Sequence, residues 1–233
     1  IQTGTKILFI GDEKQLTSIG HSNTINDLSK LPINKCQLTE PMRQAMKSGI
    51  LSICTDIRND KNPFKNKKVE LYGELNDMLV TIGDDKYWEM INDYVEKFDI
   101  NNKLDYTILA CTKKMTSRIN IDIQNGLIKK GKLKEDNNYI EINTDLKEDD
   151  KKVKMKVYPG SVLLITKNNY KLLSEEDYEN CRNEGDRCLF NGNTVIVEDI
   201  YTDAIKVSFN DEYYIIPSDF YEMLSGGYSY SIH

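Results

Sequence analysis

The sequence predicts an α/β protein whose first half builds a parallel sheet and whose second half adds a small β-rich domain. Two largely apolar runs, residues 6–10 (four of five apolar) and 106–111, each end in a polar loop, as the buried strands of parallel sheets do. A helical apolar pattern follows the second run as far as Lys129. Beyond Lys129 the spacing changes to the alternation that is typical of strands. These observations together carry the fold prediction.

The composition is that of an ordinary folded protein. Of the 233 residues, 39% are hydrophobic and 29% are charged, which argues against both a disordered chain and a membrane protein. No apolar run is long enough to cross a bilayer, and no signal peptide opens the sequence, so we expect no membrane partner. The net charge of −6 gives no general attraction to nucleic acid. Any binding of that kind therefore needs a local basic surface.

The five cysteines are odd in number and lie mostly in apolar patterns. We therefore expect free thiols in a reducing, cytoplasmic compartment, which includes a nucleoid or a viral replication site. Cys181 and Cys188 lack the close spacing and the neighbouring histidines of a zinc site, so we predict no protein-bound zinc. Because the sequence opens at Ile1 and enters a core strand almost at once, we expect a piece of a longer protein.

The first strand leads into a loop with the residue types of a ligand site. After residues 6–10 come Gly11, Asp12 and Gln15, and ligands of open α/β sheets lie at such strand ends. The amide of Gln15 can donate to a phosphate oxygen and accept from a water at once. A plain strand-to-loop turn is the alternative. A Walker B interpretation of Asp12 is weaker, because Gly11 separates the acid from the apolar run.

Four helices are expected in the first half. Leu38 is expected at a short strand or strand edge, and Pro41 leaves Arg43 on a loop. Trp88 falls inside an apolar stripe and is expected in the core rather than as a base-stacking platform. The expected helices cover residues 23–31, residues 48–58 with Ser48 as cap, residues 84–98 with Asp84 or Asp85 as cap, and the residues after Thr112 that carry Met115, Ile119, Ile123 and Leu127.

Short strands dominate the second half. Their spacing suggests a small barrel of the SH3-like kind, entered through a charged linker or hairpin. Asn191 and Gly192 favour a tight turn, an interpretation that we prefer to direct DNA contact. Ser174 and Asp177 can form a capping box for a short helix. The expected strands cover residues 139–142, 153–157, 161–166, 194–201, 204–209 and 212–217.

Several segments resemble the motifs of superfamily 1 helicases, in the family's order. G-D-x-x-Q-L at 11–16 resembles the third motif, and L-T-E-x-x-R-Q at 38–44 resembles the fourth. Residues 106–120 are similar to the segment I-L-A-x-T-N-x-x-V-x-x-I-N, although Lys113 stands where the family usually has asparagine. Residues 160–193 resemble the string G-D-x-V…N-x-Y…N-G, with Ser161 in place of an acid and Val195 in place of a later glycine. Residues 226–233 look like the start of the fifth motif.

The resemblance is closest to the RecD/Dda-like branch, with the Pif-type helicases second. It implies two RecA-like domains with ATP between them and an SH3-like insertion in the second. Residues 1–35 would end the first domain, 36–130 would form most of the second, 131–224 the insertion, and 225–233 the return to the second domain. The implied partners are single-stranded or fork DNA and a P-loop domain of the same protein that precedes this chain. No G-x-x-x-x-G-K-[ST] string occurs in the sequence.

The resemblance also implies roles for individual residues. Gln15 would sense the γ-phosphate and its attacking water, beside Gly11 and Asp12, in a site that holds ATP and Mg²⁺. Arg43 would be an arginine finger from the second domain. Contacts to DNA are implied for Thr112, Lys113, Asn191, Gly192 and His233.

The implied function is part of an ATP-dependent DNA helicase that moves 5′-to-3′ on single strands. Two alternatives are a non-catalytic helicase-like module that binds nucleic acid or a partner, and a P-loop ATPase unrelated to DNA. Because the phosphate cradle does not occur in the sequence, we expect no ATP hydrolysis by this chain alone.

Overall fold

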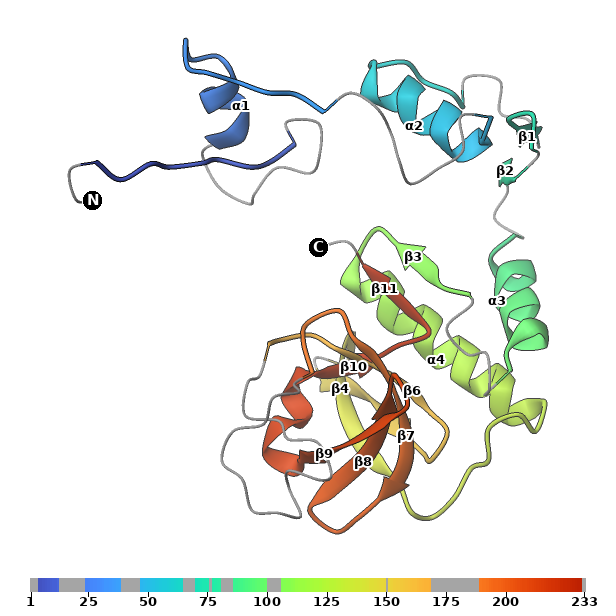
Figure 1. The fold of residues 1–233 in the computed structure, drawn as a ribbon. Coiled ribbons are helices and arrows are strands. Elements are labelled where there is room, and N and C mark those ends of the chain that lie inside the picture. The colour runs from blue at the N-terminus through green and yellow to red at the C-terminus, as the bar shows by residue number, and fades with distance from the viewer. Residues whose placement is uncertain are drawn as a thin grey trace. The chain divides into compact units, whose positions relative to one another are not determined.

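The computed structural model describes residues 4–12, 24–38, 47–64, 70–75, 77–80, 86–99, 106–149, 151–168 and 189–231. The chain divides into two compact units, Ile1–Asp84 and Asp85–His233, and each is described by itself (Figure 1). Within the described ranges, every helix is too short or too polar to cross a membrane.

The described residues of the first unit form two helices and a small antiparallel sheet. Helix α2 begins after Ser48, whose hydroxyl oxygen accepts a hydrogen bond from the Ile50 amide at 3.1 Å, so the expected cap is confirmed. Ser48 also forms an isolated bridge with Gly73, which ties the start of the helix to the end of a strand. The elements are α1 (Thr24–Ser29), α2 (Gly49–Arg58), β1 (Glu70–Tyr72) and β2 (Met78–Val80), with β1 and β2 paired antiparallel.

The expected buried strand at residues 6–10 is wrong. These residues form no strand, and Leu8 and Ile10 are 82% and 83% exposed. A strand needs a hydrogen-bonded neighbour, and the described strands of this unit pair with each other instead. The strand-edge position expected at Leu38 is also wrong, because Leu38 lies outside any strand and is 92% exposed. Apolar sequence alone therefore misplaces both segments.

The second unit combines a helical pair, a short parallel sheet and an antiparallel β-rich part. The expected helices are confirmed, and α4 begins after Thr112 as predicted. The elements are α3 (Lys86–Lys97), β3 (Ile108–Ala110), α4 (Lys113–Lys129), β4 (Ile140–Glu148), β5 (Lys151–Val157), β6 (Val162–Ile165), β7 (Thr194–Ile200), β8 (Ala204–Phe209), β9 (Glu212–Pro217), the 3₁₀ helix η1 (Ser218–Met223), β10 (Leu224–Gly226) and β11 (Ser229–Ser231).

The strands of the β-rich part pair in an open arrangement. Five of them form an antiparallel sheet in the order β10-β6-β7-β8-β9, and β4 pairs with β5 as a hairpin (Figure 1). The pairs between described strands do not close into a barrel, so the fold is a mixed α/β one without a demonstrated SH3-like barrel. The cause is the pairing of β4, whose described hydrogen-bonded partner is β5 and not an edge of the larger sheet.

One apolar core joins the helices to the β-rich part. It runs from Val95 on α3 through Leu127 on α4 to Val157 on β5 and Leu163 on β6, all nearly inaccessible to solvent. Burial of such side chains contributes about 1.5–3 kcal/mol each, so the helices and the β-rich part stabilise one another. The domain boundaries expected at residues 35, 130 and 224 stay predictions.

Trp88 does not lie in the core. It is 54% exposed, although it falls in the apolar stripe of α3. Its neighbour Tyr87 contacts α4 instead, and the Tyr87 hydroxyl donates a hydrogen bond to the Asp122 carboxylate at 2.7 Å. Trp88 packs edge-on against the Tyr87 ring, with the ring centroids 5.1 Å apart. A polar contact across the two helices therefore overrides the apolar pattern at the first turn of α3.

The start of α2 gives the first unit a pH-dependent element. Asp77 accepts a hydrogen bond from the Gly49 amide at 2.7 Å. The Ser48 hydroxyl, and then that amide, hold the pKa of the Asp77 carboxyl below its ordinary value of 3.8. A lowered pKa stabilises the folded state above about pH 4. This contribution is lost as the pH falls through the lowered value.

In the unaltered protein, we expect the Gly49 amide to lose protection against hydrogen exchange when the pH is lowered below about 4. In Asp77→Asn the amide oxygen can still accept the hydrogen bond but does not titrate, so the protection factor should change much less over that range. Equal pH dependence in the two proteins would show that Asp77 does not control the start of α2.

Candidate functional site

Thr112, which follows the predicted strand at residues 106–111, lies between a parallel strand and the start of a helix. Thr112 is the N-cap of α4, and its hydroxyl oxygen accepts from the Met115 amide at 3.2 Å. Its carbonyl also accepts from the Thr116 hydroxyl at 3.1 Å. β11 pairs with β3 in parallel, with Ser231 opposite Ala110, so both strands end at the edge where α4 begins. Ligands of α/β sheets lie at such an edge.

Two lysines stand at the positive end of the α4 helix dipole. Lys113 and Lys114 are exposed and occupy its first two positions. Within the described part of the chain, no acidic side chain forms an ion pair with either of them. Cations are unfavourable at a helix N-terminus by about 0.3–1 kcal/mol each, whereas an anion there is favourable. The arrangement therefore favours an anionic group such as a phosphate.

A buried amide holds β11 in place beside α4. Asn120 is 1% exposed, and its side-chain nitrogen donates to the carbonyl oxygens of Gly226 at 2.8 Å and Ser229 at 3.3 Å. Its side-chain oxygen accepts from the Ser229 amide at 2.7 Å and from the Ser229 hydroxyl at 3.0 Å. A Cβ at Gly226 would come within 2.7 Å of the Asn120 Cβ, so the close approach requires glycine. We call these contacts the Asn120 clamp.

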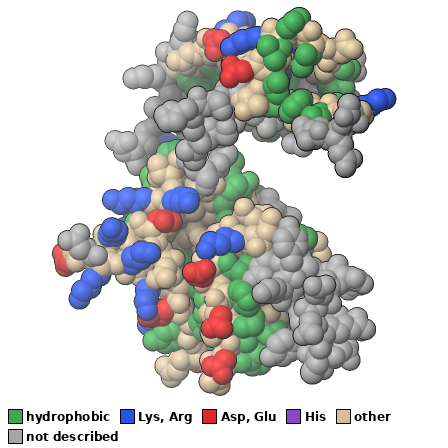
Figure 2. Space-filling view, turned by 90° about the vertical axis from the view of Figure 1, so that its left-hand side faces the viewer, with side chains coloured by type: hydrophobic (Ala, Val, Ile, Leu, Met, Phe, Trp, Pro, Cys, Tyr) green, Lys and Arg blue, Asp and Glu red, His purple; other side chains and the backbone are tan. Residues whose placement is uncertain are grey.

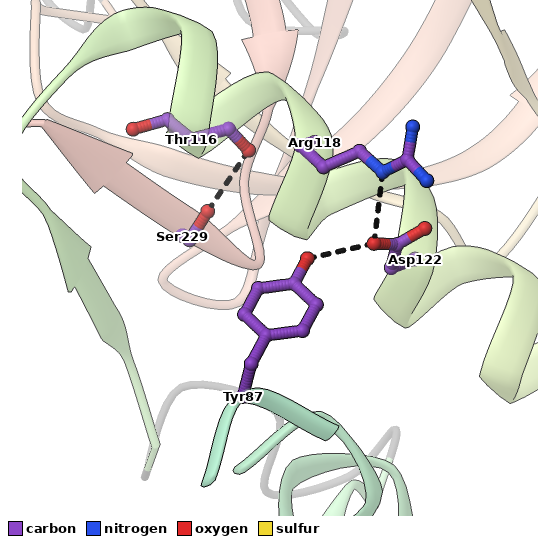
Figure 3. A network of polar contacts seen from close by, with 5 residues as sticks. All are labelled: Tyr87, Thr116, Arg118, Asp122 and Ser229. Carbon is purple, nitrogen blue, oxygen red and sulfur yellow. Dashed lines mark hydrogen bonds and ion pairs between the residues drawn. The ribbon is translucent and has the colours of Figure 1, made fainter. Parts of the chain in front are cut away.

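Asp122 on α4 links this helix to Tyr87 of α3 and pairs with Arg118 on the same helix. Asp122 accepts from the Tyr87 hydroxyl at 2.7 Å and pairs with Arg118 at 3.2 Å (Figure 3). Figure 3 also shows the Ser229 hydroxyl reaching the Thr116 carbonyl oxygen, a bond of 3.2 Å. Burial, and then the contact with Asp122, raise the pKa of the Tyr87 hydroxyl, which therefore remains a donor at neutral pH. The ion pair with Asp122 occupies part of the Arg118 guanidinium.

The predicted ATP-site residues of the first unit are described only in part. Gly11 lies beside Ile25 of α1. Asp12 forms an ion pair with Arg58 of α2 at 3.5 Å, with Asp12 about a third and Arg58 about half exposed. At that exposure the pair contributes at most about 1 kcal/mol. Its effect is to fasten the loop after residue 10 to the end of α2.

Three predicted site residues, Gln15, Arg43 and His233, lie outside the described residues. The same holds for Cys181, Cys188 and the capping box at 174–177. Within the described ranges no group of three His, Cys, Asp or Glu side chains could hold a metal ion, and Asp12 is engaged by Arg58. Among these described residues we therefore assign no Mg²⁺ ligand.

Asn191 and Gly192 form the expected turn. Gly192 has a φ of +94°, and the Asn193 amide donates to the Phe190 carbonyl oxygen at 3.0 Å. The Asn191 amide is held by the side chain of Asn168 at 2.8 Å. Among the described hydrogen bonds, none joins this turn to Thr112 or Lys113, and the contacts of both segments with DNA stay predictions.

A comparison with protein families adds one finding for the first unit. A family model described as an AAA domain matches residues 1–80, which is 80 of the 233 residues. Residues 1–80 are similar to an AAA domain. This similarity supports a nucleoside-triphosphatase character for that segment. The matched segment ends within a few residues of Asp84, the last residue of the first compact unit. No curated protein matched the chain.

Some residues of the site were not identified from the sequence. The pairing of Asp12 with Arg58 had no local signal, because 46 positions separate the two residues. Asn120 and Gln124 carried a signal that was not used, since both are amides next to the apolar positions Ile119 and Ile123 on α4. Polar residues at such spacing on a buried face indicate hydrogen bonds to neighbouring backbone.

Loss of the Asn120 side chain should destabilise the second unit. Asn120→Ala leaves the Gly226 carbonyl and the Ser229 amide without a partner in a buried position, so we expect a loss of about 2–4 kcal/mol in urea unfolding followed by circular dichroism. Asn125→Ala, an exposed amide on the same helix, should change stability by less than about 0.5 kcal/mol. Equal stability of the two variants would show that the clamp does not hold β11.

Proposed function

We propose that this chain is part of an ATP-driven translocase or helicase that acts on single-stranded DNA, of the superfamily 1 type with a RecD/Dda-like arrangement. The parent moves 5′-to-3′ and couples ATP hydrolysis to duplex unwinding. The AAA-domain similarity of residues 1–80 supports the nucleotide-driven part of the proposal. The SH3-like character of residues 131–224 belongs to the same proposal.

The observation that carries the DNA part is the anion-favouring edge formed by β3, β11 and the start of α4. Thr112 offers a capping hydroxyl, and Lys113 and Lys114 add charge beside the free amides of the first helical turn. A phosphate of a single strand fits this chemistry without any base-specific contact. The edge therefore grips the backbone irrespective of sequence, which suits an enzyme that moves along its substrate.

In the proposed parent, ATP drives the movement through Gln15 and Arg43, to which the resemblance to superfamily 1 helicases assigns roles at the γ-phosphate. In this assignment Gln15 orients the attacking water and Arg43 neutralises charge on the transferred phosphoryl group. Because the two residues belong to different domains of the proposed parent, hydrolysis changes the closure of the cleft. Alternating closure changes the grip on the strand, and stepping follows. ATP and Mg²⁺ are bound by a P-loop that the parent supplies.

A non-catalytic module that binds nucleic acid is the second candidate. The specific observation in its favour is that the anion-favouring edge lies wholly within the second unit, whereas the family similarity lies within residues 1–80. The edge can therefore bind a strand without nucleotide. Single-strand-stimulated ATP hydrolysis by the 233-residue chain would contradict this candidate, and also our expectation that the chain alone is inactive.

The lysines at the edge give the first test. Replacing Lys113 and Lys114 together by alanine removes two phosphate contacts, so we expect weaker binding of single-stranded oligonucleotides. The slope of log affinity against log salt should fall by about 1.4, since each contact to a single strand contributes about 0.7. Lys129→Ala, at the opposite end of the same helix, is the matched control and should leave the slope unchanged. An unchanged slope in the double variant would contradict the proposed edge.

The arginine finger gives the second test. In the intact parent protein, which supplies the P-loop, Arg43→Ala should lower ATP turnover at least about a hundredfold and change nucleotide affinity far less. The reason is that the finger stabilises negative charge that develops in the transition state. Arg43→Lys should rescue poorly, because a point charge cannot replace a planar fork. Near-normal turnover with a lowered melting temperature would instead make Arg43 a structural residue that pairs with Glu40 or Asp56.

A further inference from the structure

The hairpin of β4 and β5 carries lysines on one exposed face. Side chains alternate between the two faces of a strand, so Lys152, Lys154 and Lys156 of β5 share a face, and all three are exposed. Lys147 of β4 is exposed and lies directly opposite Lys152, so it belongs to the same face. We call these four residues the lysine face. Figure 2 shows Lys and Arg side chains gathered on one side of the view it presents, with acidic side chains among them.

The other face of the hairpin is anchored, which fixes the direction of the lysine face. Met155 of β5 is 3% exposed and lies in the apolar core of the second unit. The Gln124 side chain on α4 donates to the Lys156 carbonyl oxygen at 2.7 Å. On the other strand, the Asp145 amide donates to the Ser117 hydroxyl oxygen of α4 at 3.1 Å. Both strands are therefore held by the core or by α4, and the lysine face lies towards solvent.

The lysine face contains a repulsive pair. Lys147 and Lys152 occupy opposite positions in the register, and like charges at such positions destabilise a sheet. Within the described part of the chain, neither ammonium group forms an ion pair, and the same holds for Lys156. Lys154 differs, because it pairs with Glu141 at 3.0 Å. An anion bound between the first two ammonium groups would replace their repulsion by attraction.

The acidic residues of the hairpin leave this face with an excess of positive charge. Glu148 follows Lys147 directly, so alternation places it on the other face, and Asp149 lies in the turn. Asp145 and Glu141 are the acids of β4 on the side of the lysine face, against four lysines. The chain as a whole has a net charge of −6. The lysine face is therefore the kind of local basic surface that an acidic chain needs to bind nucleic acid.

A polyanion with a regular repeat fits these lysines. Side chains two positions apart on a strand are separated by about 6–7 Å. Neighbouring phosphates of a DNA strand have a similar separation. Neither β4 nor β5 contains an aromatic residue, whereas proteins that hold single strands stack the bases on aromatic rings. The proposed edge differs in this respect, because Tyr230 of β11 is 40% exposed. The lysine face therefore suits a backbone whose bases are already paired.

We propose that the lysine face binds the phosphate backbone of duplex DNA. Lys147 and Lys152 hold one phosphate, and Lys156 holds a phosphate farther along the same strand. This inference goes beyond the proposed function, because it requires neither ATP nor the edge at the start of α4. Contacts of this kind carry no base sequence, so the lysine face holds any duplex.

Protection of a strand edge is the alternative role for these lysines. Among the described strands, β5 pairs with β4 alone, and charged side chains on such an edge prevent pairing with other chains. That role is served by a charge of either sign, whereas a phosphate requires a positive one. A membrane surface fits less well, because the acidic residues Glu148 and Asp149 lie at the tip of the hairpin. Charge reversal therefore separates the roles.

The test measures binding of the 233-residue chain to a blunt DNA duplex by fluorescence anisotropy at several salt concentrations. Lys152→Glu removes a phosphate contact and places an opposite charge across from Lys147. We expect the slope of log affinity against log salt to fall by about 0.9 or more, because each contact to duplex DNA contributes about 0.9. The melting temperature should stay equal or rise, because the repulsive pair is lost.

A double variant and a control complete the test. Lys147→Gln combined with Lys152→Gln should lower the slope by about 1.8, for two contacts. Lys129→Glu, at the far end of α4, changes the net charge by the same amount and should leave the slope unchanged. A thymidine oligonucleotide should respond to alanine at Lys113 and Lys114 and not to the hairpin variants. The proposed edge and the lysine face can therefore fail separately.

Four results would overturn the proposal. The first is an unchanged duplex slope in the double variant, and the second is an equal fall in Lys152→Glu and Lys129→Glu. The third is an equal fall for duplex and single strand in the hairpin variants, which would show that paired bases are not preferred. The fourth is loss of binding to phosphatidylserine vesicles with an unchanged duplex slope, which would assign the face to a membrane.

Discussion

The geometry of the second unit depends on one buried amide. Asn120 has four hydrogen bonds to Gly226 and Ser229, and it is almost inaccessible to solvent. A buried amide can use its donors and acceptors only if the partner backbone lies in one register. The Asn120 clamp therefore specifies where the chain lies after it leaves the β-rich part. That position in turn sets the pairing of β11 with β3.

The candidate nucleic-acid edge is a consequence of this constraint. With β11 in register, two parallel strands end beside the N-terminus of α4, where Thr112 caps the helix. The two lysines of the first turn then lie where an anion is favoured and a cation is not. A local electrostatic feature is thus set by a contact between residues more than a hundred positions apart. This is why loss of the clamp and loss of the lysines should have different consequences: the first alters the fold, the second alters binding alone.

Local sequence patterns predicted the helices and most strands. They failed where the structure of a segment depends on a partner that is distant in the sequence. Ser48 was recognised as a cap because a cap needs only the next few residues, and the helix after Thr112 was recognised from its apolar period. Residues 6–10 have the composition of a buried strand, but a strand requires a pairing partner that the pattern cannot supply. The short strands β10 and β11 were missed because their residues, rich in glycine and serine, carry no strand pattern. Trp88 was misplaced because its neighbour Tyr87 takes the contact with α4.

The candidate site was predictable to the same degree. The position of Thr112 and Lys113 at a strand end followed from an apolar run and a helical period. The turn at Asn191 and Gly192 followed from residue type. The cavity that Gln124 lines did not follow from the sequence, because its walls come from α4, β5 and the segment between α4 and β4, which only the folded chain brings together.

The most direct test of the central claim is hydrogen exchange of the 233-residue chain with and without a single-stranded oligonucleotide, in the absence of ATP. The Met115 and Thr116 amides already donate to Thr112, so bound phosphate should occupy the remaining amides of the first turn of α4, and we expect slower exchange at residues 113 and 114 on binding. Measurable binding of the oligonucleotide with unchanged exchange in that turn would contradict it.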